Sequence, residues 1–300
     1  MVQGTMHVVN SAVVNNTAGG QGGGIYNHNT GQLFVTNSTV SGNTASTDPG
    51  EAPGGGGISN NTNVTSNPAR VTLTNSTVAY NSSPTNGGGI SNAGTGTFNL
   101  RNSIIGQNNS NSPTGRNALG VFTSQGFNLI GTTVGSSGWI THDILDRDPL
   151  LAPLGSNGGN TFTHALLPGS PAINAGNDAL ALDPQTMFPL VFDQRGFARF
   201  IGTVDIGAYE AFYSTSPVTV GGRVLRLNGR GISGARVTLT EPGGTVRYAV
   251  TNPFGHYRFV DLTPGTAYTL AATSKSYQFT SPQIVTADQN RSDLDFTANF

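Results

Sequence analysis

The stretch Val71–Asn92 reads VTLTNSTVAYNSSPTNGGGISN, and its parts recur along the first third of the chain. The pattern NS-x-V-x-x-N occurs four times, with Ile for Val in the last copy, and GGGI-x-N occurs three times. The first pattern begins at Asn10, Asn37, Asn75 and Asn102 and ends six residues later at Asn16, Asn43, Asn81 and Asn108. The copies are 27, 38 and 27 residues apart, so a constant unit alternates with loops of variable length. Such self-similarity indicates a solenoid.

Short segments inside the repeat predict β-strands. Val71 and Leu73 alternate with threonine, Val78 lies in a second segment, and Ile90 follows three glycines. β-Branched residues, glycine and asparagine oppose helix formation, and asparagine tolerates the left-handed conformation of a sharp corner. We therefore expect three strands and three corners per repeat, which make one triangular coil of a parallel β-helix.

Stacked coils would place equivalent side chains about 4.8 Å apart, which is the strand spacing. Two aliphatic columns are expected in the core: Val13, Val40, Val78 and Ile105, and Ile25, Ile58 and Ile90. Asparagines at equivalent positions are expected to form hydrogen-bonded amide ladders. Besides the two sets above, a third set follows the glycine triplets at Asn27, Asn60 and Asn92.

Composition excludes several classes of function. Charged residues make up 10% of the 300 residues and the net charge is −1, so the chain has no basic surface for nucleic acid. No stretch is apolar enough to span a membrane, and Met1–Ile25 does not look like a signal peptide. The absence of cysteine excludes disulfides and thiolate metal sites. Abundant Ser, Thr, Asn and Gly are typical of extracellular solenoids, so we expect a secreted or cell-surface location. Because the sequence opens part-way into a repeat, we expect it to be the tail of a longer protein or a chain whose start was removed by processing.

Residues from about 131 to 213 depart from the repeat. Prolines become frequent, and charges appear after a nearly charge-free stretch, at Asp193, Arg195, Arg199, Asp205 and Glu210. An open coil end presents unpaired backbone groups that must be covered. We therefore interpret this region as the closing end of the solenoid, with these charges as a network that fixes it to the last coils.

Six motifs in this region resemble the choice-of-anchor Q domain of bacterial surface proteins, within the pectin-lyase-like group. They are DPLL (148–151), NGG (157–159), THAL (163–166), GSPA (169–172), DQRG (193–196) and DIGAYE (205–210). The resemblance, with the upstream repeats, covers roughly two thirds of the chain. It implies a right-handed parallel β-helix at a cell surface, and it implies location more than activity.

A different pattern begins after a short linker at 214–217. Residues 218–300 contain about seven alternating runs separated by turn signals, which predicts a β-sandwich. The segments Gly234–Val237, Gly255–Phe259 and Pro264–Tyr268 resemble the carboxypeptidase regulatory-like domain, a transthyretin-like sandwich. The resemblance implies a spacer, stalk or docking module. The expected organisation is an all-β chain with a β-helix at 1–213 and an Ig-like or transthyretin-like sandwich at 218–300.

Enzyme chemistry requires groups that the repeats lack. Glycoside hydrolysis needs two carboxylates facing one cleft, and lyase chemistry needs calcium ligands and a base. The only acids in residues 1–142 are Asp48 and Glu51, in one loop, and the histidines at 7, 28 and 142 are isolated. We therefore expect no enzyme and assign no catalytic, cofactor-binding or metal-binding residue.

Asp143, Asp146 and Asp148 form an acidic cluster whose spacing suits calcium. Arg147 sits among them, and no glycine-bearing calcium loop surrounds them. We interpret them as turn formers and leave calcium open.

These features predict a non-enzymatic, extracellular structural or adhesive protein, with a β-helix rod and a sandwich spacer. One alternative is the subunit of a self-associating extracellular filament. The other is a carbohydrate-binding protein or an inactive relative of polysaccharide lyases, with a sugar bound on Tyr26, Tyr80 or exposed loop aromatics, although Trp139 is the only tryptophan. The expected partners are therefore further copies of the chain, a cell-surface glycan or a host surface.

Overall fold

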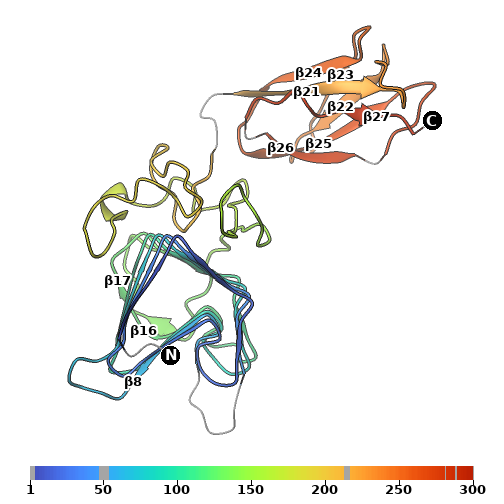
Figure 1. Cartoon of the computed structure of the whole chain (residues 1–300). Helices are drawn as coiled ribbons and strands as arrows, with labels where there is room; N and C mark the ends of the chain where they lie inside the picture. The colour runs from blue at the N-terminus through green and yellow to red at the C-terminus, as the bar shows by residue number, and fades with distance from the viewer. Residues whose placement is uncertain (1–3, 47–53, 213–216, 281, 288, 300) are drawn as a thin grey trace. The chain divides into compact units, whose positions relative to one another are not determined.

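The computed structural model describes residues 4–46, 54–212, 217–280, 282–287 and 289–299, and its elements are almost all short strands (Figure 1). The predicted all-β class is confirmed, since the helical structure of the described residues is limited to one 3₁₀ turn at Asp178–Leu180. The chain divides into two compact units, Met1–Ala211 and Phe212–Phe300. Apart from Pro217, the expected linker at 214–217 lies outside the described residues.

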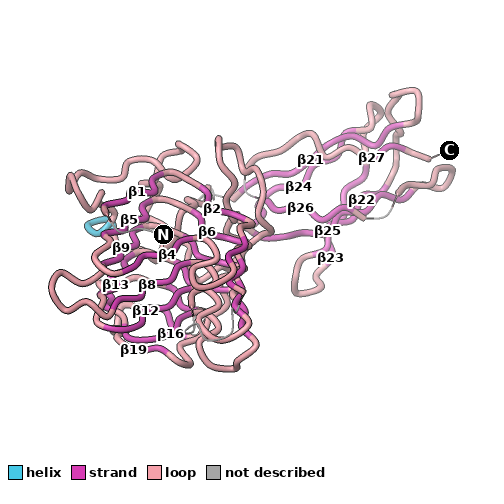
Figure 2. Tube along the Cα trace, turned by 60° about the horizontal axis from the view of Figure 1, so that its bottom comes forward, coloured by secondary structure: helices cyan, strands magenta, loops and turns pink. Residues whose placement is uncertain are grey.

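The first unit is a stack of coils whose strands form four parallel sheets. The first sheet contains β1 (Thr5–Val9), β5 (Gln32–Thr36), β9 (Arg70–Thr74), β13 (Thr97–Arg101) and β17 (Thr123–Ser124). The second contains β2 (Ala12–Val14), β6 (Thr39–Ser41), β10 (Thr77–Ala79), β14 (Ile104–Gly106), β18 (Leu129–Ile130) and β20 (Ile144–Leu145). The third contains β3 (Thr17–Ala18), β7 (Thr44–Ala45), β11 (Ser82–Ser83) and β15 (Asn109–Ser110). The fourth contains β4 (Ile25–His28), β8 (Ile58–Thr62), β12 (Ile90–Gly94), β16 (Ala118–Val121) and β19 (Ser136–Ser137). Figure 2 shows β1, β5, β9 and β13 one beneath another.

The expected triangular coil is wrong, because a coil has four strands rather than three. The additional strands belong to the third sheet and are two residues long. In one of them, Ser82 pairs with Thr44 of the preceding coil and with Asn109 of the next. Segments this short and polar have no alternation that separates them from a loop, so only pairing between coils reveals them.

The predicted aliphatic columns are confirmed by strand register. Val78 lies opposite Val40 on one side and Ile105 on the other, and Val40 lies opposite Val13. In the fourth sheet, Ile58 lies between Ile25 and Ile90. These residues belong to one apolar core, and each fully buried aliphatic side chain contributes about 1.5–3 kcal/mol to folding.

Corners of the coil use the left-handed conformation at two positions per repeat. The first asparagine of each pattern adopts it, with φ of 49° at Asn10, 53° at Asn37, 42° at Asn75 and 47° at Asn102. At the next corner, the residue before the second asparagine adopts it instead: Asn15, Gly42, Tyr80 and Gln107. The second asparagines are thus free to direct their amides into the coil.

The second unit is a sandwich of two sheets, as predicted. One contains β24 (His256–Leu262), β21 (Val218–Leu225) and β27 (Phe296–Thr297). The other contains, in order, β23 (Val246–Val250), β22 (Arg236–Thr240), β25 (Thr266–Thr273) and β26 (Gln283–Ala287). Alternate residues of both sheets, such as Val237, Leu239, Tyr257 and Phe259, meet in an apolar core.

Candidate functional site

Asparagine amides form a continuous ladder along one corner of the coils, and all of them except that of Asn16 are buried. The amide nitrogens (Nδ2) of Asn16, Asn43 and Asn81 donate to the Oδ1 atom of the asparagine in the next coil, at 2.9, 2.8 and 3.0 Å. Asn108 continues the ladder by donating to Asn117 at 3.2 Å. Asn117 escaped the sequence analysis because it lies nine residues after Asn108 and outside the repeated pattern. Asn81 Nδ2 also binds the Val40 and Ala79 carbonyls, so this amide is fully used.

The other two asparagine sets behave differently from each other. Asn27 donates to Asn60 and Asn60 to Asn92, both at 2.8 Å, as predicted. The corner asparagines form only two pairs, Asn10 with Asn37 and Asn75 with Asn102. Between them the expected ladder is interrupted, because Asn37 Oδ1 accepts a hydrogen bond from Arg199 instead.

The segment 146–211, which we call the cover, packs along the side of the β-helix. Its His164 reaches Ser41, its Gln194 accepts from Thr39 at 2.6 Å, and its Ala208 N–H donates to Thr77. All residues of β6, β10 and β14 are consequently buried, on the outer face as well as the inner face. Figure 1 shows the cover, in green to yellow, beside the coils.

This placement corrects the interpretation of residues 131–213 as a closing end. Residues up to 145 still extend the stack through β19 and β20. The cover then runs back along the second sheet and reaches Asn37, which belongs to the second copy of the repeat. On the outer face, β6 and β10 carry the small or hydroxyl side chains of Thr39, Ser41, Thr77 and Ala79, so the cover approaches these strands closely. Pro149 likewise lies against Gly106 of β14.

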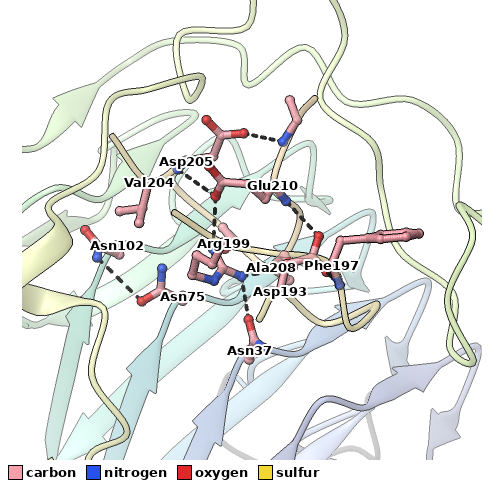
Figure 3. A network of polar contacts seen from close by, with 12 residues as sticks. Asn37, Asn75, Asn102, Asp193, Phe197, Arg199, Val204, Asp205, Ala208 and Glu210 are labelled. Carbon is pink, nitrogen blue, oxygen red and sulfur yellow. Dashed lines mark hydrogen bonds and ion pairs between the residues drawn. The ribbon is translucent and has the colours of Figure 1, made fainter. Parts of the chain in front are cut away.

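Arg199 anchors the cover through a fully buried guanidinium (Figure 3). Besides Asn37, it donates to the carbonyls of Gly207 and Ala208 at 3.2 Å each, and it lies 3.6 Å from a Glu210 carboxyl oxygen. Arg195 forms an ion pair with Asp193 at 2.6 Å and donates to the Glu210 carbonyl. The five charges do form a network, but it binds the cover to itself and to Asn37 of an early coil, and the expected attachment to the last coils is wrong.

The acids of the network hold backbone amides. Asp205 accepts from the N–H groups of Asn174 and Ala211 at 2.7 and 2.5 Å. Glu210 accepts from the Asp205 N–H at 3.0 Å, and its own N–H donates to Asp193 at 3.0 Å. Each carboxylate therefore closes a loop of the cover that has no regular strand pairing.

Burial decides the protonation of these acids. Desolvation, reinforced by the charge of Asp205, raises the pKa of Glu210 to about 9 despite the nearby Arg199. Desolvation also raises the pKa of Asp205, to about 6. Both shifts favour the neutral form of a carboxyl, and a proton on Glu210 relieves the repulsion between its carboxyl and that of Asp205.

Raised carboxyl pKa values occur at active sites and in structural ion-pair networks alike. Here Asp205, Glu210 and Arg199 are each at most 1% exposed. Their polar atoms mostly bind protein groups, while Glu210 Oε1 is buried without a hydrogen-bond partner. No reacting atom faces solvent, so this arrangement fits a structural clamp.

His164 is a buried residue through which the cover contacts the coils. In the sequence it stood out only as part of the THAL motif. Its Nε2 lies 2.8 Å from Ser41 Oγ and its Nδ1 lies 2.8 Å from the Ala152 carbonyl. A carbonyl only accepts, so Nδ1 carries the proton and Nε2 accepts from the serine. Burial lowers the pKa of His164, which favours the neutral ring. Ser41 and His164 are both 2% exposed, so this pair joins the cover to β6 without access for a substrate.

The acidic cluster is dispersed in the structure. Asp143 accepts from Asn128 and the Ile140 N–H, Asp146 from Thr133, and Asp148 from Gln107. Within the described residues no group of three acids or histidines converges for a metal ion. Asp48 and Glu51 lie outside the described residues.

The aromatic residues considered for sugar binding lie on different elements. Tyr26 stands beside His28 on β4, and Tyr80 packs 4.9 Å from the His164 ring. Trp139 stacks on Phe122 at 5.2 Å, against the core. The structure does not bring these three rings together into one platform.

A shallow cleft of about 630 Å³ lies in the sandwich. Its polar lining includes Thr219, Asn252, His256, Arg258 and Arg291, and none of the described residues that line it is a carboxylate. Arg291 is paired with Asp293 at 2.8 Å, beside the lining. These described lining residues suit a neutral or anionic group better than a cation.

Fold and sites define an all-β protein that joins a covered parallel β-helix to a sandwich. The sandwich matches the carboxypeptidase regulatory-like domain family over residues 219–299, as the sequence resemblance predicted. No curated protein matches the chain. The described part of the chain contains no helix with the length and apolar character of a membrane span.

Proposed function

We propose that this chain is a non-enzymatic structural and adhesive protein of a bacterial cell surface or of the extracellular space. The β-helix serves as a rigid rod and the sandwich as a spacer or docking module. One observation supports this most: the polar groups inside the coils and the charges beneath the cover are bound to one another. Groups committed to stiffness in this way are not available to a substrate.

The location rests on sequence. The motifs between 148 and 210 resemble the choice-of-anchor Q domain, and we assign the β-helix to that pectin-lyase-like group. Low charge and abundant Ser, Thr, Asn and Gly agree with an exported solenoid.

The cover supplies the adhesive surface in this proposal. Large apolar side chains are exposed on it, among them Phe162 at 53%, Phe188 at 72% and Phe192 at 57%. Exposed apolar surface of this kind marks contact sites. Contact through these side chains needs no catalytic group.

Two assays of the full chain test the proposal. Incubation with a panel of polysaccharides is expected to release no products, and enzyme-like turnover would overturn it. Binding of labelled protein to bacterial cells and to apolar surfaces is expected to fall at least about threefold in a Phe188→Ser, Phe192→Ser variant. Phe254→Ser, at a residue of the sandwich that is 70% exposed, is the matched control and should bind as the parent does.

The cleft of the sandwich favours a second candidate function, the binding of an acidic glycan. Its lining combines His256 and Arg258 with neutral polar groups. An array that contains acidic and neutral glycans would test this candidate. Binding confined to acidic glycans and weakened by Arg258→Gln is expected, and an array without hits removes it.

A further inference from the structure

Strand β23 forms one edge of the four-stranded sheet, where it pairs with β22 alone among the described strands. Three of its side chains point to the outer face and are strongly exposed: Val246 at 51%, Tyr248 at 64% and Val250 at 65%. Natural edge strands are usually protected by lysine, proline or a bulge. The β23 sequence VRYAV contains no lysine or proline, and its register with β22 runs without a break.

Hydrogen bonds that flank the strand show which backbone groups face outward. Glu241 N–H donates to the Thr245 carbonyl, and Thr251 N–H donates to the Ala235 carbonyl. Residues of an antiparallel pair alternate between bonding the partner strand and pointing away from it. Arg247 and Ala249 therefore bond β22, and the N–H and C=O groups of Val246, Tyr248 and Val250 point to the open edge.

The outward residues read the same in both directions, Val-x-Tyr-x-Val. An antiparallel pair centred on Tyr248 places Tyr248 opposite its own copy and Val246 opposite Val250 of that copy. All three outward residues then lie at hydrogen-bonding positions at once. Cross-strand aromatic and β-branched pairs add about 0.2–1 kcal/mol each.

Charges do not oppose this pairing. The Arg247 guanidinium donates to the Val260 carbonyl at 2.7 Å, toward the other sheet. Arg236, which stacks on Tyr248 at 4.3 Å, lies beside Val250 on β22. In the paired arrangement, Arg236 and Val250 of one copy lie in line with Val246 and Thr240 of the second copy, across the four neighbouring strands. No two arginines therefore face each other.

We propose that β23 binds a second copy of this chain, in an antiparallel pair that joins two four-stranded sheets into one of eight. The pair is two-fold symmetric and uses both β23 edges, so it closes as a dimer and does not propagate as a filament. This inference goes beyond the proposed function and does not depend on it.

Cysteine cross-linking of the full chain tests the register, because the chain contains no cysteine of its own. Opposed residues at a hydrogen-bonded position have Cα atoms about 5.5 Å apart, within the range of a disulfide. Tyr248→Cys is therefore expected to form disulfide dimers. Val246→Cys is the matched control on the same strand and face, since its own copy lies four residues away in register. A Val246→Cys, Val250→Cys double variant should cross-link again.

The expected rate for Tyr248→Cys is at least about tenfold that for Val246→Cys. Equal rates would show random collision and would overturn the proposal. Sedimentation of cysteine-free protein gives an independent readout. Tyr248→Lys should lower the dimer fraction at least about fivefold, whereas Ile284→Lys, at a residue of the opposite edge strand that is 79% exposed, should not. A parent chain that stays monomeric at all concentrations, or dimers lost in Ile284→Lys alone, would contradict it.

Discussion

Asparagine has two distinct tasks in the β-helix. At the first corner it adopts the left-handed backbone that most residues avoid, as in Asn75 with φ of 42°. At the second corner its backbone is ordinary and its side chain does the work, as in Asn81, whose amide joins three coils. The two tasks explain why the same residue recurs six positions apart although the local geometry differs.

Removing one rung from the middle of the ladder should be costly. Asn81→Ala removes the amide that links Asn43 to Asn108 and that binds the Val40 and Ala79 carbonyls in a buried site. It also leaves the Asn43 backbone N–H without the oxygen that accepts from it. We expect a loss of about 2–5 kcal/mol in the free energy of unfolding, measured by urea denaturation. Asn16→Ala, at the exposed end of the ladder, should cost less than about 1 kcal/mol. Equal losses would contradict the ladder's role.

Glu210 should make stability depend on pH. Its folded pKa, about 9, lies above its unfolded value near 4.5, so the folded state binds more protons between these two pH values. Stability contributed by the neutral carboxyl is therefore complete below pH 4.5 and is lost as the pH rises toward 9. Glu210→Gln keeps a neutral group and should flatten this loss. Thermal melts from pH 5 to 9 measure it, and parallel curves for parent and variant would refute the assignment.

The glycine triplets make room for the ladder at the scale of the coil. A Cβ atom added at Gly57 would lie 2.7 Å from the Gly89 carbonyl oxygen and 2.9 Å from the Asn81 amide nitrogen. A Cβ atom added at Gly24 would likewise clash with the Gly57 carbonyl oxygen and with the Asn43 side chain. The backbone of one coil therefore rests directly on the backbone and the amide of its neighbours.

Gly57→Ala should destabilise the β-helix by about 1–3 kcal/mol or more, because the clashing atom is backbone and cannot move alone. Gly20→Ala is the matched control, since nothing lies within 4 Å of the added atom. It should change the free energy of unfolding by less than about 0.5 kcal/mol. Urea denaturation measures the free energy of unfolding of both variants. A Gly57→Ala variant as stable as the parent would contradict the close stacking.

The cover depends on a few buried polar contacts rather than on strand pairing. Arg199→Met preserves much of the side-chain volume but leaves Asn37, the carbonyls of Gly207 and Ala208 and the Glu210 carboxyl without the guanidinium. We expect a loss of about 3–5 kcal/mol and earlier cleavage within 146–211 by protease. Arg116→Met, on an exposed side chain, serves as control and should resemble the parent. Cleavage elsewhere first would show that Arg199 does not hold the cover.

For the whole molecule, sequence reasoning succeeded where the chain repeats itself. The columns through Val78 and Ile58 follow from alignment of the copies, because each copy must meet its equivalent in the next coil. Seven strands are described in the sandwich, the number expected from alternation and turn residues. Both signals are local, and both recur.

The features that the sequence did not predict occur only once in the chain or depend on residues far apart in it. The cover reaches the second copy of the repeat through contacts such as His164 with Ser41, 123 residues apart, and Arg199 with Asn37, 162 apart. No spacing in the sequence predicts such pairs. The charges of the network were identifiable as unusual, but their position along the side of the coils required the fold.

Hydrogen exchange of the full chain tests most directly whether coils and cover form one covered rod. We predict that amides of β6, β10 and β14 exchange slowest in the first unit, and that amides of 199–211 are protected with them. Arg199→Met should accelerate exchange in both groups together. Fast exchange throughout 146–211 beside fully protected coils would contradict the account.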